Sequence, residues 1–203
     1  GSMKNSSTDG ISPAPRGKAW LDVGCGPSKL EGATGIDMFD LPGVDVVYNL
    51  ESFPWPFQDS QFDHIVCRHS INHLSDLVAV MAELHRICKP GGMIEIIAPH
   101  YASDNFNTDP THRTALGIRS MNYFCDNVAF KYRYYSKSRF ELVRSNISFR
   151  DNRTDFRKSV PFNPFRWVGI EQLVNAIPRI YERFFVYWLP PSELYFKLRV
   201  VKP

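Results

Sequence analysis

Short apolar runs alternate with polar, turn-rich segments along most of the chain, a pattern typical of buried strands in an α/β protein. Residues 75–88 instead carry apolar side chains at helical spacing, with Ser75 as the expected N-cap and a Lys-Pro-Gly-Gly stop. The pattern predicts a doubly wound, mostly parallel sheet of seven strands. The expected strands are 19–23, 34–38, 44–48, 62–67, 93–98, 139–149 and 194–201.

The first expected strand ends in L-D-V-G-C-G, where Gly24 and Gly26 allow a sharp turn and a close approach of backbone N–H groups to a ligand. A dinucleotide fingerprint needs a third glycine and an acid about 20 residues later. This chain has Lys29 at the third position, and Asp37 arrives too early for a full crossover helix, so we expect a shortened first crossover. A nucleoside ligand without phosphates, such as S-adenosylmethionine, suits this turn.

Five linked signatures then follow in order over roughly half of the chain, residues 19–99. Through them the chain resembles the class I S-adenosylmethionine-dependent methyltransferases, in particular the small type-11-like members. The resemblance implies a Rossmann-like fold, S-adenosylmethionine as cofactor and methyl transfer, but no particular substrate. The signatures are L-D-V-G-C-G-P (21–27), G-I-D-M-F-D (35–40), F-P-W-P-F-Q-D-S-Q-F-D-H-I (53–65), H-S-I-N-H-L (69–74) and L-H-R-I-C-K-P-G-G (84–92).

The resemblance also implies which residues surround the methionyl end of the cofactor. Asp22 is expected to orient the glycine turn and the amino group of the ligand, although it could serve only as a strand-end cap. Backbone groups of Gly24 and Gly26 are expected to contact the methionyl group. Arg68 and His69, which follow the fourth strand, are expected to lie beside it.

The nucleoside end is expected at the second and third strands. Asp37 should accept both ribose hydroxyls, because one carboxylate offers two oxygens to paired donors, and Met38 follows it in the same signature. Asn49 and Leu50 stand where relatives often carry an acid that contacts the adenine edge. The asparagine departs from that pattern, but its amide oxygen can still accept from the exocyclic amine.

Methyl transfer to a hydroxyl requires removal of a proton, a task that histidine suits near neutral pH. We predict that His73 and His112 flank the acceptor, one taking the proton and the other holding the substrate. His100 is a lesser candidate because its ring could simply pack. Alternatively, His73 and His112 are both polar loop residues with local hydrogen bonds. The polar segment 100–120 that carries His112 is the expected lid.

The same histidines also suggest a metal site. His69 and His73 have the H-x-x-x-H spacing of two ligands on one helical face, and Asp109 lies in the lid with His100 and His112. The helix is expected to begin only near residue 75, so this face would not form. We therefore predict no metal.

The predicted function is methyl transfer to a small polar acceptor, such as a hydroxyl of a sugar or secondary metabolite, with a histidine base; N-methylation comes second. The alternatives are a catalytically silent binding or assembly subunit and an RNA methyltransferase. The last would use basic residues concentrated in 129–158, which could also bind an anionic substrate or form a solvated face. These are Lys131, Arg133, Lys137, Arg139, Arg144, Arg150, Arg153, Arg157 and Lys158.

Composition limits the remaining choices. A length of 203 residues with 43% hydrophobic residues suits one domain over 18–203, preceded by a tag scar and a disordered arm at 1–17. A net charge of +3 is too small to argue for DNA binding. Four cysteines without C-x-x-C pairing and no membrane-length apolar run favour the cytoplasm. An insertion at about 151–191 carries aromatic side chains that could form a homodimer contact.

Overall fold

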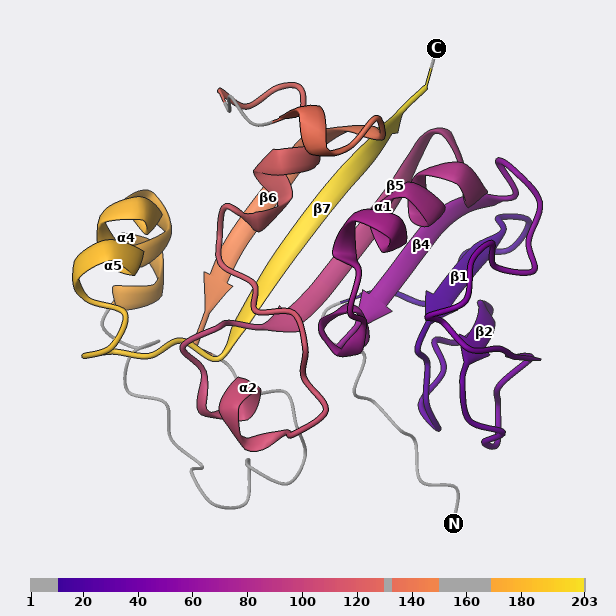
Figure 1. Ribbon diagram of the computed structural model, residues 1–203, viewed down its shortest axis with the longest axis horizontal. Helices are drawn as coiled ribbons and strands as arrows, with labels where there is room; N and C mark the ends of the chain where they lie inside the picture. The colour runs from indigo at the N-terminus through magenta and orange to yellow at the C-terminus, as the bar shows by residue number, and fades with distance from the viewer. Residues whose placement is uncertain (1–10, 130–132, 150–168, 203) are drawn as a thin grey trace.

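Seven strands form one sheet in the computed structural model, which describes residues 11–129, 133–149 and 169–202 (Figure 1). Their order is β3-β2-β1-β4-β5-β7-β6. Strands β1 to β5 run parallel, whereas β7 is antiparallel to both β5 and β6. This arrangement confirms the predicted mostly parallel α/β sheet. The strands are β1 (Trp20–Val23), β2 (Thr34–Asp37), β3 (Val46–Val47), β4 (Phe62–Arg68), β5 (Cys88–Pro99), β6 (Arg139–Ser148) and β7 (Glu193–Val201).

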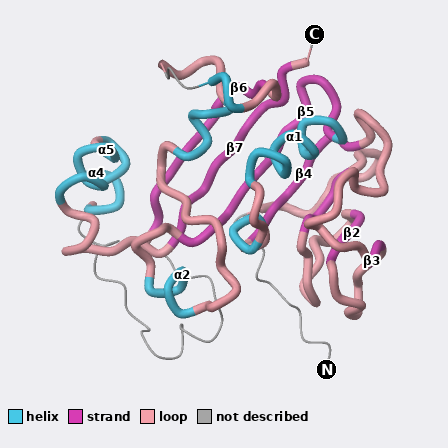
Figure 2. Tube along the Cα trace, in the orientation of Figure 1, coloured by secondary structure: helices cyan, strands magenta, loops and turns pink. Residues whose placement is uncertain are grey.

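All helices of the described residues follow β4 in the chain, whereas β1, β2 and β3 are joined by loops, the pink segments of Figure 2. Residues 24–33 contain turns and no helix, so the predicted short first crossover is confirmed. None of the helices in the described ranges combines the length and apolar character that a bilayer crossing needs. The helices are η1 (Ile71–His73), α1 (Leu77–Ile87), α2 (Asp104–Thr108), η2 (Ser120–Phe124), η3 (Arg133–Tyr135), α4 (Ile170–Ala176) and α5 (Pro178–Phe184).

Alternate residues of β4 enter two separate hydrophobic clusters, because side chains alternate across a strand. Ile65 and Cys67 belong to the large cluster with the buried stripe of α1, whereas Val66 belongs to a smaller one. The smaller cluster contains Leu30 from the first crossover and Ile11. The short crossover thus covers the second face of the sheet with loop side chains.

Ile11 and Ala14 lie in the segment that composition assigned to the disordered arm, but they pack on the domain. Ile11 is 5% exposed, and the backbone N–H of Ala14 donates to Glu31 O at 2.9 Å. The hydrophobic side chain of Ile11 fills a gap that a crossover helix would otherwise close. Residues 1–10 lie outside the described ranges.

The N-cap of helix α1 lies one residue later in the chain than the sequence predicts. Asp76 is the N-cap, and its carboxylate accepts the backbone N–H of Ala79 at 2.9 Å. The hydroxyl of Ser75 is occupied elsewhere, since it donates to Glu51 at 2.7 Å. The prediction of Ser75 as N-cap is therefore wrong, because the carboxylate of the next residue reaches the free amide first.

The insertion before β7 contains two helices divided at Pro178. Pro178 occupies the first turn of α5, where its missing N–H leaves no hydrogen bond unmade. Asn175 of α4 joins the insertion to β6, because its amide donates to Ile147 O at 2.8 Å and accepts Ile147 N at 2.7 Å. Residues 150–168 of the predicted insertion lie outside the described ranges.

Candidate functional site

The two glycines after β1 form a left-handed turn at the carboxyl edge of the sheet. Gly24 has φ +64° and Gly26 has φ +53°, a region that other residues rarely adopt. A Cβ added to Gly24 would lie 2.4 Å from Ser70 Cβ, whereas one added to Gly26 would meet nothing within 4 Å. The turn therefore packs tightly against the segment after β4 and leaves open space at Gly26.

Asp22 and Arg68 anchor the segment that follows the glycine turn. The fully buried carboxylate of Asp22 accepts Leu30 N at 2.8 Å and the Arg68 guanidinium at 2.7 Å through Oδ2. Arg68 also donates to Ser28 O at 2.7 Å. Burial raises the pKa of Asp22, and the Arg68 charge opposes that shift. Asp22 Oδ1 has no hydrogen-bond partner among the described residues.

Asp37 lies at the end of β2, where its side chain receives two backbone N–H groups. Gly26 N donates to Oδ2 at 2.9 Å, and Phe39 N donates to Oδ1 at 3.0 Å. A carboxylate has about four acceptor positions, so each oxygen can accept one more hydrogen bond. The next side chain, Met38, is 54% exposed and lies free to cover a ligand.

Asn49 and Leu50 follow the short strand β3 and differ in their access to a ligand. The Asn49 side chain accepts Glu51 N at 3.0 Å through Oδ1 and is exposed. Leu50 is buried in the main core, and its carbonyl accepts the indole N–H of Trp55 at 3.1 Å. Only Asn49 therefore presents its side chain at the surface where the adenine is expected.

His69 and Ser70 follow β4 directly beside the glycine turn. His69 has φ +51°, and its Nε2 lies 3.2 Å from Glu193 Oε1. His69 Nδ1 and Ser70 Oγ are buried and have no hydrogen-bond partner among the described residues. Together with Asp22 Oδ1, they supply polar atoms to this edge of the sheet.

His100 has both ring nitrogens engaged. Its Nδ1 accepts Ala102 N at 3.1 Å, so Nε2 carries the proton and donates to Glu182 at 3.1 Å. The residue is fully buried. This environment fastens α5 to the end of β5 and leaves no lone pair for a substrate, so we do not propose His100 as the base.

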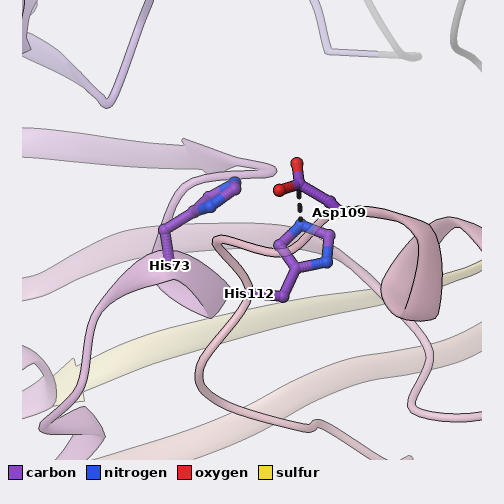
Figure 3. Close-up of side chains that lie close together, drawn as sticks. All are labelled: His73, Asp109 and His112. Atoms are coloured by element: carbon purple, nitrogen blue, oxygen red, sulfur yellow. Dashed lines mark ion pairs between the residues drawn. The ribbon is translucent and has the colours of Figure 1, made fainter.

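His73 and His112 lie together, as the sequence predicts for a catalytic pair, and Asp109 joins them (Figure 3). The ring centroids of the two histidines are 4.5 Å apart. His112 Nε2 is 3.7 Å from Asp109 Oδ2, and the far end of the His73 ring points toward the same carboxylate. The histidine side chains come from η1 and from the lid segment, which are 39 positions apart in the chain.

Hydrogen bonds fix the proton positions on both rings. Thr111 Oγ1 donates its only proton to Asp109 Oδ1 at 2.6 Å, so His73 Nδ1 must donate to Thr111 Oγ1 at 2.9 Å. His112 Nδ1 donates to Phe106 O at 2.9 Å, because a carbonyl can only accept. In their neutral forms, both histidines therefore carry a lone pair on Nε2.

The charges in this cluster follow from burial and hydrogen bonding. Burial lowers the pKa of His73, and the nearby His112 adds to the shift. The Thr111 hydroxyl and backbone N–H lower the pKa of Asp109 by stabilising its carboxylate. A neutral His73 thus lies beside an ionised Asp109 near neutral pH.

The lid segment is tied to η1 near the glycine turn. Arg113 N and Thr114 N both donate to Asn72 O, at 2.8 and 3.0 Å, and the Thr114 hydroxyl donates to Leu74 O at 2.7 Å. Asn72 lies two residues after Ser70, the residue that packs on Gly24. These hydrogen bonds therefore hold the histidine cluster near the glycine turn, where the cofactor is expected.

A separate hollow of about 1080 Å³ lies between the lid and helix α5. None of its lining residues is among those expected to bind the cofactor. Its lining combines arginines and aromatic rings, which favour anionic or aromatic ligands. Prominent among them are Tyr101, Arg119, Tyr123, Arg179, Arg183 and Phe184.

Thr111 and Ser70 are the site residues that the sequence analysis missed. The D-P-T-H sequence held a usable signal, since a threonine two residues after an aspartate favours a local hydrogen bond between them. Ser70 gave no such signal, because its contact with Gly24 joins segments that follow β1 and β4, which are neighbours in the sheet but far apart in the sequence.

Comparison with known proteins agrees with this geometry. Residues 6–152 match the family described as "Methyltransferase domain". The chain belongs to the S-adenosylmethionine-dependent methyltransferases. This methyltransferase is 33% identical over 99 residues to the ubiquinone biosynthesis O-methyltransferase of Pseudomonas paraeruginosa, covering 38% of this chain and 43% of the relative. The match thus spans less than half the length of that relative.

Solved structures with the same fold cover nearly all of the methyltransferase. The YcgJ protein of Bacillus subtilis has a TM-score of 0.54 at 15% identity, covering 95% of this chain and 94% of that one. The [4+2]-cyclase SpnF has a TM-score of 0.56 at 17% identity, covering 95% of this chain and 77% of that one. At these identities, the likeness shows the fold alone.

The residues at the glycine turn fit S-adenosylmethionine. The open space at Gly26 and the spare acceptor capacity of Asp37 suit a nucleoside held without phosphate contacts. The unpartnered Asp22 Oδ1 and Ser70 Oγ suit the charged amino acid end. These side chains would hold the cofactor.

Proposed function

We propose that this methyltransferase methylates a hydroxyl of a small polar acceptor, and that His73 Nε2 takes the hydroxyl proton. When bound, S-adenosylmethionine supplies an electrophilic methyl group. The observation that supports the proposal is the pair of Nε2 lone pairs on His73 and His112, fixed by the Thr111 and Phe106 hydrogen bonds. His73 is the more accessible of the two, since the His112 side chain is only 1% exposed.

Asp109 supports this proton transfer in two ways. Its negative charge stabilises the imidazolium that forms when His73 accepts the proton. Through Thr111 it also keeps Nδ1 protonated and Nε2 free, as an orienting carboxylate does in other histidine bases. His112, held by Phe106 O, is left to bind the acceptor oxygen.

The acceptor is proposed to be small, and a negative charge on it would suit the hollow beside the lid. Arg119, Arg179 and Arg183 line that hollow with aromatic rings. A sugar, a sugar phosphate or a phenolic metabolite would meet these requirements. Five of the nine basic residues at 129–158, which would support an RNA acceptor, lie outside the described residues.

The O-methyltransferase assignment, rather than N-methylation, rests on the histidine cluster and on the name of the Pseudomonas relative. A hydroxyl must lose its proton as the new bond forms, so it gains more from a fixed base than an amine does. The buried, unpaired cysteines agree with the cytoplasmic location that we propose.

Calorimetry with S-adenosylmethionine separates this enzyme from a silent binding subunit. We expect binding in the micromolar range that is common for working ligands. An absence of heat and of thermal stabilisation by S-adenosylhomocysteine would favour the silent subunit. A positive result would then be followed by screening sugar and phenolic hydroxyls for formation of S-adenosylhomocysteine.

Asp37→Asn should weaken cofactor binding by about 10- to 100-fold, the size expected for a lost charged hydrogen-bond acceptor. The amide oxygen can still accept one of the two backbone N–H groups, which limits damage to the turn. Asp40→Asn removes the same charge from an exposed residue three positions away and should change affinity less than about twofold. Equal affinities in the two variants would move the ribose site elsewhere.

We also propose that the aromatic cluster at the end of α5 and just after it forms a homodimer contact. Phe184, Phe185, Tyr187 and Trp188 are 63, 52, 79 and 89% exposed, an unusual concentration of large apolar side chains. Sedimentation equilibrium should give a dimer mass for the wild type and a monomer mass for Trp188→Ser. A monomer mass for the wild type at all concentrations would refute the contact.

A further inference from the structure

The cluster of His73, Asp109 and His112 contains three hydrogen-bond acceptors that face one another. The Nδ1 atom of each histidine donates a hydrogen bond, so Nε2 is the nitrogen left to bind a ligand, and Asp109 Oδ2 is the carboxylate oxygen not used by Thr111. One ligand atom from each residue lies within 4.8 Å of the others. Such a group is unfavourable unless a proton or a cation lies between its members.

A proton shared between His112 and Asp109 satisfies the cluster poorly. Their closest approach is 3.7 Å, which is too long for a hydrogen bond. His112 Nε2 is buried and has no hydrogen-bond partner among the described residues. The side chain is nevertheless held rigidly, because Phe106 O accepts its Nδ1–H and the Phe106 ring stacks on the imidazole.

The surrounding hydrogen bonds are those that orient metal ligands. A ligating histidine usually donates its second ring N–H to a carbonyl or to a hydrogen-bonded carboxylate system, which fixes the tautomer and the ring. His112 donates to Phe106 O, and His73 donates to Thr111, which in turn binds Asp109. Both imidazoles are thus prepared to bind through Nε2.

From these contacts we infer that His73, Asp109 and His112 bind a divalent transition-metal cation. Metal–ligand bonds of 2.0–2.2 Å place tetrahedral ligands about 3.4 Å apart, so the 3.7 Å pair needs to close by only a few tenths of an ångström. Two imidazoles and one carboxylate favour zinc or iron over magnesium, which prefers oxygen ligands. Three protein ligands leave coordination positions open, as in catalytic rather than structural sites.

This site differs from the H-x-x-x-H pair that the sequence suggested. His69 follows β4, and its Nε2 lies 3.2 Å from Glu193 Oε1. The expectation of no metal followed from the helix start near residue 75, which keeps His69 and His73 from sharing a helical face. In the structure, His73 lies instead beside Asp109 and His112 of the lid. The sequence alone could not show that these three side chains meet.

Its role in catalysis rests on the proposed function, although binding itself does not. A cation at this point would coordinate the oxygen of a hydroxyl acceptor at an open position and favour its loss of a proton to water. With the cation bound, His73 Nε2 would be a ligand, and the metal would replace it in activating the hydroxyl. His73 Nε2 would take the proton directly, as proposed above, when no cation is bound. Metal binding can therefore be measured without any acceptor.

The test is a titration of chelator-treated protein with Co²⁺. The visible absorption of bound Co²⁺ monitors binding, and elemental analysis after dialysis gives the stoichiometry. We expect one Co²⁺ per chain, displaced by Zn²⁺ and unaffected by Mg²⁺. Asp109→Asn and His112→Gln should weaken Co²⁺ binding by at least about 100-fold. Thr111→Val removes the hydroxyl bonds to His73 Nδ1 and Asp109 Oδ1 but no ligand atom, and should weaken binding by about 10- to 100-fold. His85→Gln, a change to a histidine on α1 outside the cluster, should bind as the wild type does.

Thermal unfolding without metal checks that each variant is folded, and Thr111→Val tests the site even if a ligand variant is unstable. No stoichiometric Co²⁺ binding by the wild type, or equal binding by the cluster variants, would overturn the inference and leave a shared proton as the occupant. Metal binding without detectable methyl transfer would retain the site and reject the proposed function. Methyl transfer that persists in chelator, by a protein that binds no Co²⁺, would retain the proposed function and reject the metal site.

Discussion

Gly24→Ala should lower the free energy of unfolding by about 2–5 kcal/mol, combining left-handed backbone strain with a steric clash. The added Cβ would lie 2.4 Å from Ser70 Cβ, so the segment after β4 must move. That segment carries His69 on one side and η1 on the other. We therefore expect the variant to lose cofactor affinity as well as stability, measured by urea unfolding and calorimetry.

Two other glycines separate strain from contact. Gly17→Ala introduces the same left-handed strain at φ +78° with nothing within 4 Å, and should cost only about 1–2 kcal/mol with normal cofactor binding. Gly26→Ala should cost a similar amount of stability but lose cofactor affinity, because its Cβ would enter the space proposed for the ligand. Equal unfolding energies for all three variants would show that the packing of Gly24 on Ser70 contributes nothing.

The sheet could be predicted because its determinants are local in the sequence. The apolar runs that become β1 and β4 are bounded by turn residues, and ten residues between Gly26 and Asp37 leave no room for a crossover helix. Helix α1 was expected for the same reason, through its apolar stripe. Its cap was missed because two adjacent capping residues compete, and a contact with distant Glu51 decides between them.

The composition of each face was less predictable. Ile11 lies in a polar, serine- and proline-rich stretch, yet it is buried because the short crossover leaves apolar surface on Val66 uncovered. A single hydrophobic residue in a polar segment gives no periodicity to detect. Its burial depends on a gap that exists only once the sheet has formed.

Some contacts of the candidate site could likewise be predicted from the sequence, and others could not. The expected cofactor residues follow strands that the sequence places side by side, so Asp37 and Gly26 meet as a consequence of strand order. The pairing of His73 with His112 could be proposed from the family pattern and the lid position. The hydrogen bonds through Thr111 and Phe106, which decide where each proton sits, depend on the path of the lid and needed the structure.

His73→Ala and His112→Ala should each lower kcat by about 100-fold or more while leaving cofactor affinity within about twofold. The loss of turnover follows because neither remaining histidine can both accept the hydroxyl proton and hold the oxygen. Cofactor affinity should persist because neither side chain bonds to the glycine turn or to Asp37 in the described contacts. Release of S-adenosylhomocysteine with a hydroxyl acceptor, and calorimetry, provide the two measurements.

Added imidazole separates the contributions of the two histidines. It should restore part of the turnover of His73→Ala, because that side chain is partly exposed and its place can be reached from solvent. His112→Ala should not recover, since its side chain is 1% exposed and packs against Phe106. Near-normal turnover in both variants would remove the pair from the reaction. Equal rescue of both would contradict their different burial, and with it the assignment of His73 as the group that takes the proton.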